Sequence, residues 1–242
     1  MRNTRKKELS RRSFIKTGTT AATVFSIVPG HVVGANGKTP PSEKLNIAGI
    51  GIGGMGRGNI GACKGENVVA LCDVDSAYAG KTFKAHPNAA TYVDYRVMLE
   101  KQKDIDAVVI ATPDHTHAVI TMAAIEMGKH VYCQKPLTHT VEEARKITAA
   151  ARASKVQTQM GNQGHSSDAI RVVREWVQSG SIGDVKEVHA WTDRPDDGPW
   201  YANFGARDLP SDFPAVPDSL NWDLWLGPTQ DRKFSPAYHP FK

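Results

Sequence analysis

The chain has 242 residues, which is room for one or two domains. Its formal net charge is +5, but residues 1–35 hold seven of the 30 Lys and Arg residues and only one of the 25 Asp and Glu residues. The remainder is close to neutral, so the charge gives no reason to expect nucleic acid as a partner. Three cysteines, an odd number, predict neither a disulfide framework nor a metal site.

The N-terminal residues 1–35 carry a short basic motif followed by a mildly apolar stretch. The motif is Ser-Arg-Arg-Ser-Phe-Ile-Lys at 10–16, and it resembles a twin-arginine signal peptide. This resemblance implies the twin-arginine export machinery as a partner and a periplasmic or extracytoplasmic location. The alternative is a disordered basic tail. We expect no stable membrane span, because threonines, Pro29 and His31 interrupt the apolar stretch.

Residues 51–56, Gly-Ile-Gly-Gly-Met-Gly, fit the pattern G-x-G-x-x-G between a predicted strand at 45–50 and a predicted helix start. Such glycines let backbone N–H groups approach a pyrophosphate at the positive end of a helix. A second predicted strand, 68–72, ends at Asp73, 22 residues after Gly51, where a carboxylate can accept a hydrogen bond from a ribose hydroxyl. The residues predicted to bind the cofactor here are Gly51, Gly53, Gly54, Met55, Gly56 and Asp73.

The cofactor is expected to be NAD, with NADP less likely, because no basic residue directly follows Asp73. The alternative interpretation is an ordinary strand-to-helix turn followed by an aspartate at the end of a strand.

Strands and helices alternate along the rest of the first half of the chain. The predicted elements are helix 76–86, strand 90–93, helix 95–102, strand 105–111, helix 116–128, strand 130–133, a helix that a Thr140 to Glu143 capping box opens and that ends near 154, and strand 156–160. This order predicts an α/β fold, a Rossmann-type doubly wound parallel sheet over residues 44–165, with ligands at the carboxyl ends of its strands.

Polar loops follow three of these strands. They read Thr-Pro-Asp-His-Thr-His at 112–117, Gln-Lys-Pro-Leu at 134–137 and Gly-Asn-Gln-Gly-His at 161–165. Because the carboxyl ends of parallel strands share one edge of the sheet, we expect the loops to meet there. From position alone, His117 is as well explained as a residue at the start of a helix, and Lys135 as a solvated loop lysine.

Together these loops resemble the Gfo/Idh/MocA oxidoreductases, the family of glucose-fructose oxidoreductase and inositol dehydrogenase. The most specific parts are Ala-Thr-Pro-Asp-x-x-His at 111–117 and Lys-Pro at 135–136, and the resemblance spans residues 44–242. It implies cofactor contacts from Thr112, Pro113, Asp114, His117, Gln134 and Lys135.

The resemblance also implies the chemistry. Lys135 would be catalytic, with a hydrogen bond to the reacting oxygen. Asn162, Gln163 and His165 would face the substrate, with His165 as a second catalytic candidate, although a surface or capping role for His165 stays open. The family usually has Glu where this chain has Gln134, and an amide supplies no negative charge to hold an ammonium group.

Residues 166–242 predict a linker helix at 167–179, then a strand at 185–191 that alternates polar and apolar residues. In the resembled family such a strand begins an α+β substrate domain, whose sheet also provides a possible homo-oligomer contact at full length. Too few residues follow for that domain, so we expect a truncated start of it. The proton-transfer histidine of the family has no counterpart here.

The leading hypothesis is an enzyme: an exported NAD-dependent oxidoreductase that transfers hydride between a hydroxyl carbon of a sugar, cyclitol or other polyol and nicotinamide. One alternative is an NAD-dependent glycosidase that uses transient oxidation and elimination. Another is a non-catalytic nucleotide-binding protein or an inactive fragment.

Overall fold

The computed structural model describes residues 39–191 and 210–238. The chain divides into two compact units, 1–44 and 45–242. The first contributes a short 3-10 helix, Pro41–Glu43, and the predicted export signal lies outside the described residues. No helix within the described ranges has the length and apolar character that crossing a membrane requires.

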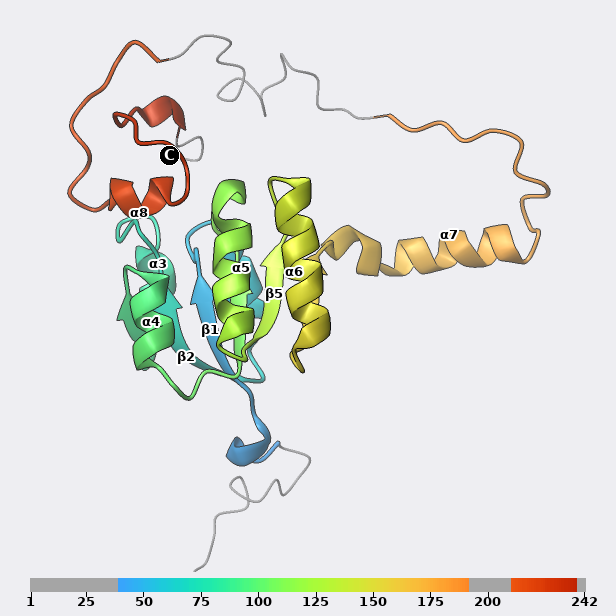
Figure 1. The fold of residues 1–242 in the computed structure, drawn as a ribbon. Helices are drawn as coiled ribbons and strands as arrows, with labels where there is room; N and C mark the ends of the chain where they lie inside the picture. Colours follow the sequence, from blue (N-terminus) through green and yellow to red (C-terminus); the bar gives the residue numbers. More distant parts are fainter. Residues whose placement is uncertain (1–38, 192–209, 239–242) are drawn as a thin grey trace, which may run out of the picture. The chain divides into compact units, whose positions relative to one another are not determined.

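The second unit is built on a six-stranded parallel sheet in the order β3-β2-β1-β4-β5-β6, which confirms the predicted doubly wound fold (Figure 1). The strands are β1 Asn46–Ile50, β2 Asn67–Cys72, β3 Ala90–Tyr92, β4 Ala107–Ile110, β5 His130–Gln134 and β6 Thr158–Gly161. The helices are α2 Met55–Ala62, α3 Gly80–Ala85, α4 Tyr95–Lys101, α5 His117–Glu126, α6 Val141–Ala153, α7 Asp168–Gln178 and α8 Trp222–Leu226. The strand order reverses between β1 and β4, where such folds bind ligands.

Helices cover both faces of the sheet. On one face the side chains of α4, α5 and α6 pack on alternate strand residues such as Ala48, Val108 and Ile110, which are fully buried. Figure 1 shows α5 and α6 side by side over this face. On the other face Ile60 of α2 packs against Ile47 and Leu71. Cys72 and Cys133 are buried free thiols, as expected for small apolar residues in strands.

The register of the sheet decides which residues meet at its carboxyl edge. Ile50 lies opposite both Cys72 and Ile110, and Ile110 lies opposite Cys133. The next residue along each strand therefore emerges at the same level. The sheet itself places the start of the glycine loop next to the end of β2, and the end of β5 one strand beyond β4 at the same edge.

Two helix starts show how side chains set the boundaries. Thr140 Oγ1 accepts a hydrogen bond from Glu143 N, and the Glu143 carboxylate accepts from Thr140 N, so the predicted capping box is confirmed. The helix predicted from residue 76 begins only at Gly80. The reason is Asp75, whose carboxylate accepts from the N–H groups of Ala77 and Tyr78 and so stabilises a turn instead of helix.

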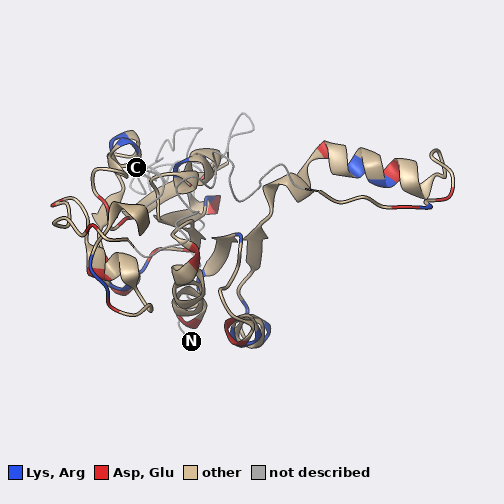
Figure 2. Ribbon diagram, turned by 90° about the horizontal axis from the view of Figure 1, so that it is seen from above, with Lys and Arg blue, Asp and Glu red and all other residues tan. Residues whose placement is uncertain are grey.

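The predicted linker helix is confirmed as α7, and Figure 2 shows acidic and basic residues interleaved along it. The predicted strand at 185–191 is wrong, because this stretch is irregular and its side chains are exposed. A strand requires the backbone hydrogen bonds of a partner strand, and none within the described residues pairs with this one. Alternation alone does not supply a partner.

A segment from residue 217 to 238, which includes α8, packs on the loop that follows β2. Asn221 N donates to Val74 O at 2.8 Å, and Ser76 N donates to Ser219 O at 2.9 Å. Trp222 stacks on Trp225 with ring centroids 4.7 Å apart and contacts Phe234 edge-on. The division into domains at residues 165 and 166 stays a prediction, but this segment contacts the sheet domain directly.

Candidate functional site

A cavity of about 780 Å³ lies at the carboxyl ends of β1, β2, β4 and β5. Its walls come from the glycine loop, the end of β2, the loop between β3 and α4, the loops after β4 and β5, and the α8 segment. Of the predicted cofactor residues, those that line it are Gly51, Gly53, Gly54, Met55, Asp73, Thr112, Pro113, Asp114, His117, Gln134 and Lys135.

The glycine loop has two positions where a side chain does not fit. Gly51 has φ +74°, and a Cβ there would lie 2.6 Å from Thr112 N. A Cβ on Gly56, which is buried behind the cavity, would collide with Gly51 O. Gly54 precedes α2 without any side-chain cap, so the N–H groups of the first turn are available to an anion.

Asp73 holds the glycine loop to the end of β2. Its Oδ2 accepts from Ile52 N at 2.8 Å and its Oδ1 from Asp75 N at 3.0 Å. The carboxyl is 9% exposed, and this burial raises the pKa of Asp73 although the backbone donors lower it. Each carboxylate oxygen can accept a second hydrogen bond, so the predicted ribose contact stays possible beside this structural role.

Two cavity residues near the glycine loop were missed by sequence reasoning. The ring of Tyr78 lies directly against Gly53, and a Cβ on Gly54 would lie 2.6 Å from the Tyr78 hydroxyl. Arg96 lines the cavity from the start of α4, and its side chain donates three charge-assisted hydrogen bonds to Asp94. The sequence carries no signal for either contact, because the fold alone brings Tyr78 and Arg96 to the cavity.

His117 is the first residue of α5, which confirms the alternative interpretation of this histidine as a helix-start residue. It is 1% exposed, and its ring lies between two backbone carbonyls: Nδ1 is 2.6 Å from Pro136 O and Nε2 is 2.8 Å from Thr112 O. The ring thus joins the loop after β4 to the loop after β5. A direct contact of His117 with a cofactor stays a prediction.

Gln134 and Lys135 present different groups to the cavity. Gln134 is 4% exposed, and its Nε2 has no hydrogen-bond partner among the described residues. A buried donor without a partner is unfavourable unless a ligand accepts from it. Lys135 is exposed and forms none of the ion pairs found in the described part of the chain. Both residues line the cavity, Lys135 with an exposed cation and Gln134 with an amide whose Nε2 is buried.

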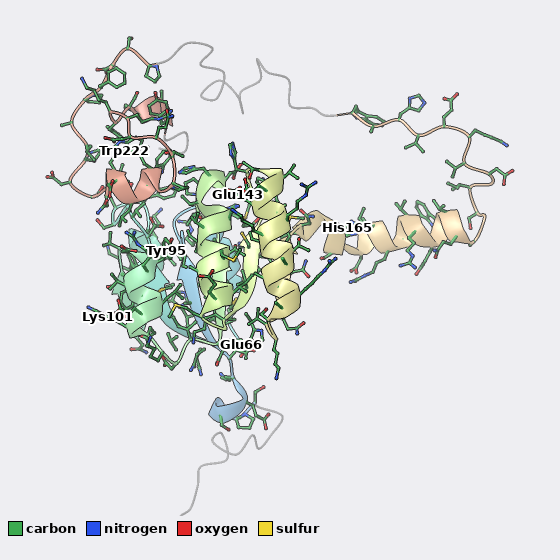
Figure 3. The ribbon with its side chains drawn as sticks, viewed as in Figure 1. Glu66, Tyr95, Lys101, Glu143, His165 and Trp222 are labelled. Atoms are coloured by element: carbon green, nitrogen blue, oxygen red, sulfur yellow. The ribbon has the colours of Figure 1, made fainter. Side chains whose placement is uncertain are left out.

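The α8 segment forms a wall that the sequence did not predict. His115 Nε2 lies 2.8 Å from Trp225 O, and the two rings are 5.0 Å apart. Burial lowers the pKa of His115, so the ring is neutral at pH 7 and donates from Nε2. Figure 3 marks Trp222 on α8 and Tyr95 at the start of α4. The signal in the sequence was the tryptophan-rich stretch Asn-Trp-Asp-Leu-Trp-Leu-Gly-Pro at 221–228.

The predicted substrate-side residues are not brought to this cavity. Asn162, Gln163 and His165 are exposed in the turn after β6, and none of them is among its lining residues (Figure 3 labels His165). Their substrate role stays a prediction. Within residues 39–191 and 210–238, no group of three or more His, Cys, Asp or Glu side chains is placed to hold a metal ion.

Residues 45–162 match the family GFO_IDH_MocA, described as an oxidoreductase family with an NAD-binding Rossmann fold. They form a Gfo/Idh/MocA NAD-binding domain. This confirms the resemblance that the strand-end loops indicated, and with it the expectation of NAD as the cofactor of the fold.

Known relatives of this Gfo/Idh/MocA domain act on cyclitols and sugars. The chain is 31% identical over 162 residues to inositol 2-dehydrogenase of Serratia proteamaculans, covering 65% of this chain and 48% of that protein. It is 35% identical over 126 residues to 1,5-anhydro-D-fructose reductase of Ensifer adhaerens, covering 51% and 38%.

Among solved structures, the domain resembles scyllo-inositol dehydrogenase from Lactobacillus casei with bound NAD(H) and scyllo-inositol. The TM-score is 0.54 at 26% identity, over 59% of this chain and 43% of that one. The chain therefore spans about half the length of that inositol 2-dehydrogenase and somewhat less of that scyllo-inositol dehydrogenase.

Proposed function

We propose that this chain is the cofactor-binding part of an NAD-dependent oxidoreductase that acts on a hydroxyl carbon of a sugar or cyclitol. The observation that carries the proposal is the meeting of two groups in one cavity: the glycine loop with Asp73, and the pair Gln134 and Lys135. The relatives named above supply the substrate class.

The residues present fit NAD. The first turn of α2 has no side-chain cap, so its N–H groups can receive a pyrophosphate. The ring of Tyr78, which lies against Gly53 and Gly54, would have to turn aside for that ligand. Asp73 has acceptor capacity left for a ribose hydroxyl. When bound, NAD supplies a nicotinamide ring that accepts or donates hydride.

The chain's own contribution to the chemistry is electrostatic. When hydride leaves an alcohol carbon for the nicotinamide, the hydroxyl proton passes to solvent water, and the C–O bond becomes a carbonyl. An ammonium group at Lys135 donates a hydrogen bond to that oxygen and stabilises the negative charge that the oxygen gains. Gln134 Nε2 is buried and without a partner among the described residues, and it would donate to a ligand oxygen once its amide turns toward the cavity.

The test has two stages. Titration of the purified chain with NADH is expected to give saturable binding, and Lys135→Met is expected to leave that binding within about threefold, since an exposed lysine contributes little to binding. In the second stage, a longer polypeptide is used, in which this chain is followed by a second half like that of the relatives. It is incubated with NAD and myo-inositol. NADH formation that Lys135→Met abolishes supports the proposal. Release of sugar from a glycoside without net NADH would instead indicate the glycosidase, and binding without turnover a non-catalytic protein.

A separate proposal concerns residues 1–35. The paired arginines and the mildly apolar stretch support export by the twin-arginine machinery, which carries proteins that are already folded. A protein that collects its cofactor before it leaves the cytoplasm would benefit from this route.

A further inference from the structure

The wall that the α8 segment gives to the cavity lies outside the matched NAD-binding domain. The family match ends at residue 162, whereas the α8 segment covers residues 217–238. Its residues that line the cavity are Asp223, Leu224, Trp225, Gly227, Pro228 and Tyr238. The other walls carry the predicted cofactor residues. The cavity is therefore built from two parts of the chain that are far apart in the sequence.

One end of the α8 segment is attached to the turn that follows β2. Ser76 N donates to Ser219 O at 2.9 Å, and the Ser219 hydroxyl donates to the Asp75 carboxylate at 3.1 Å. Leu220 forms an antiparallel bridge with Asp75. Asp75 lies two residues beyond Asp73, the predicted acceptor for a ribose hydroxyl. The attachment is thus beside the place where the ribose of the adenosine is expected.

Further along, the α8 segment contacts the loop after β4. Trp225 O lies 2.8 Å from His115 Nε2. Gly227 comes so close to this loop that a Cβ on it would lie 3.0 Å from Thr116 Cγ2. In the sheet, β1 lies between β2 and β4, so the α8 segment joins the two loops that flank the glycine loop. Lys135 follows β5, which lies beyond β4 from the end of β2.

The α8 segment has a small core of its own. Its buried residues Leu220, Trp222, Leu226 and Phe234 form a hydrophobic cluster that is separate from the two clusters of the sheet. A part of a protein with its own small cluster can open locally while the rest stays folded. Local opening of the α8 segment would uncover the cavity without disturbing the sheet, as lids over binding sites do.

We propose that the α8 segment is a strap over the adenosine half of the NAD site: it opens to admit the cofactor and slows its release when closed. Trp225 and Tyr238 at the cavity wall offer aromatic faces on which an adenine can stack. The strap rests on the proposed function, because it acts only if the cavity holds NAD. It extends the cofactor site to residues beyond the family match.

The first test measures how fast NADH leaves the full chain. The chain is loaded with NADH and mixed rapidly with excess ADP-ribose, and the change in NADH fluorescence gives koff. In Trp222→Ala, which loses the centre of the aromatic cluster, koff is expected to rise about tenfold while kon changes less. Trp191→Ala, at a position 86% exposed, is the control and should keep the wild-type koff. An unchanged koff in Trp222→Ala would overturn the strap.

The second test asks which half of the cofactor the strap covers. ADP-ribose lacks the nicotinamide and keeps the adenosine. Its Kd should rise in Trp222→Ala by the same factor as the Kd of NADH, because the lost contacts lie on the adenosine side. A loss of affinity for NADH alone would place the α8 segment over the nicotinamide and contradict the proposal.

A third measurement uses the wild-type chain and does not depend on the folding of a variant. Hydrogen exchange of peptides from residues 217–228 should slow when NADH or ADP-ribose is added to saturation, while that of α6 peptides stays the same. Saturable NADH binding with unchanged exchange of residues 217–228 would remove the strap and leave the proposed function standing. A wild-type chain that binds neither ligand would refute both.

Discussion

The backbone N–H of Ile52 donates to the carboxylate of Asp73 at 2.8 Å, so the residue that ends β2 also fixes the glycine loop that follows β1. A second oxygen of the same carboxylate accepts from Asp75 N. The shape of the cofactor loop and the acceptor predicted for the ribose therefore depend on one side chain.

This dependence predicts a pH effect. Burial raises the folded-state pKa of Asp73 above its usual 3.8, so the stability that this group contributes is greatest in acid and declines as pH rises through the folded pKa. NADH binding should depend on pH in the opposite direction to stability, because only the ionised carboxylate of Asp73 accepts hydrogen bonds at both oxygens. NADH affinity should fall on acidification with a midpoint above 3.8, as measured by titration at several pH values. If NADH affinity falls in the same way at low pH in Asp73→Asn, Asp73 is not the group whose protonation weakens binding.

Two glycines of α2 offer a matched pair of substitutions. Gly56→Ala places a Cβ against Gly51 O, so we expect loss of NADH binding and a clear drop in the free energy of unfolding. Gly58→Ala meets nothing within 4 Å and should stabilise the helix by about 0.5–1 kcal/mol without a change in binding. Denaturant unfolding and NADH titration of both variants check this. Similar behaviour of the two variants would refute the claim that the glycine loop binds the cofactor.

The amide of Gln134 should serve ligand binding and not stability. Gln134→Met removes a buried donor that has no partner in the described residues, so the free energy of unfolding should be unchanged or slightly higher. The Kd for NADH should rise about fivefold. Gln157→Met, at an exposed position before β6, is the control and should change neither quantity. A marked loss of stability in Gln134→Met would mean that the amide has a partner within the protein.

The segment 217–238 should detach when its aromatic centre is removed. Trp222 donates to Arg232 O at 2.8 Å and packs on Trp225 and Phe234. In Trp222→Ala, hydrogen exchange of peptides from this segment should accelerate while that of β1 and β4 stays slow, since the sheet has its own core. Trp191→Ala, at a position 86% exposed, is the control. Equal exchange in both variants would show that the segment is held by other contacts.

Export depends on the arginine pair if residues 1–35 are a twin-arginine signal. Fused to a reporter that folds in the cytoplasm, these residues should direct it out of the cytoplasm in a bacterium that has the pathway. Replacement of Arg11 and Arg12 together by lysine should retain the reporter inside, as cell fractionation would show. Retention of the unmodified fusion would contradict the signal.

The sheet could be predicted because its signals are local. Buried strands such as 107–110, the Thr140 capping box and the glycine pattern each act through near neighbours, and together they predict the alternation of strands and helices. The register then brought Asp73 and Gln134 to one edge, as expected from the rule for parallel strands.

Contacts between distant segments were not predictable in this way. Trp225 meets His115 across 110 residues, and no pattern in either segment specifies the other. The strand expected at 185–191 was wrong because alternation describes one strand and not its partner. His117 was left between two interpretations, since only the fold shows that both ring nitrogens face carbonyls.

The central claim is that the cavity at the carboxyl ends of β1, β2, β4 and β5 holds NAD. Calorimetric titration of the 242-residue chain with NADH, beside the Gly56→Ala variant, tests it most directly. We expect one NADH per chain, binding about tenfold tighter than NADPH because Asp73 disfavours a 2′-phosphate, and no binding to the variant. No heat of binding from the folded wild-type chain, or equal binding by the variant, would contradict the claim.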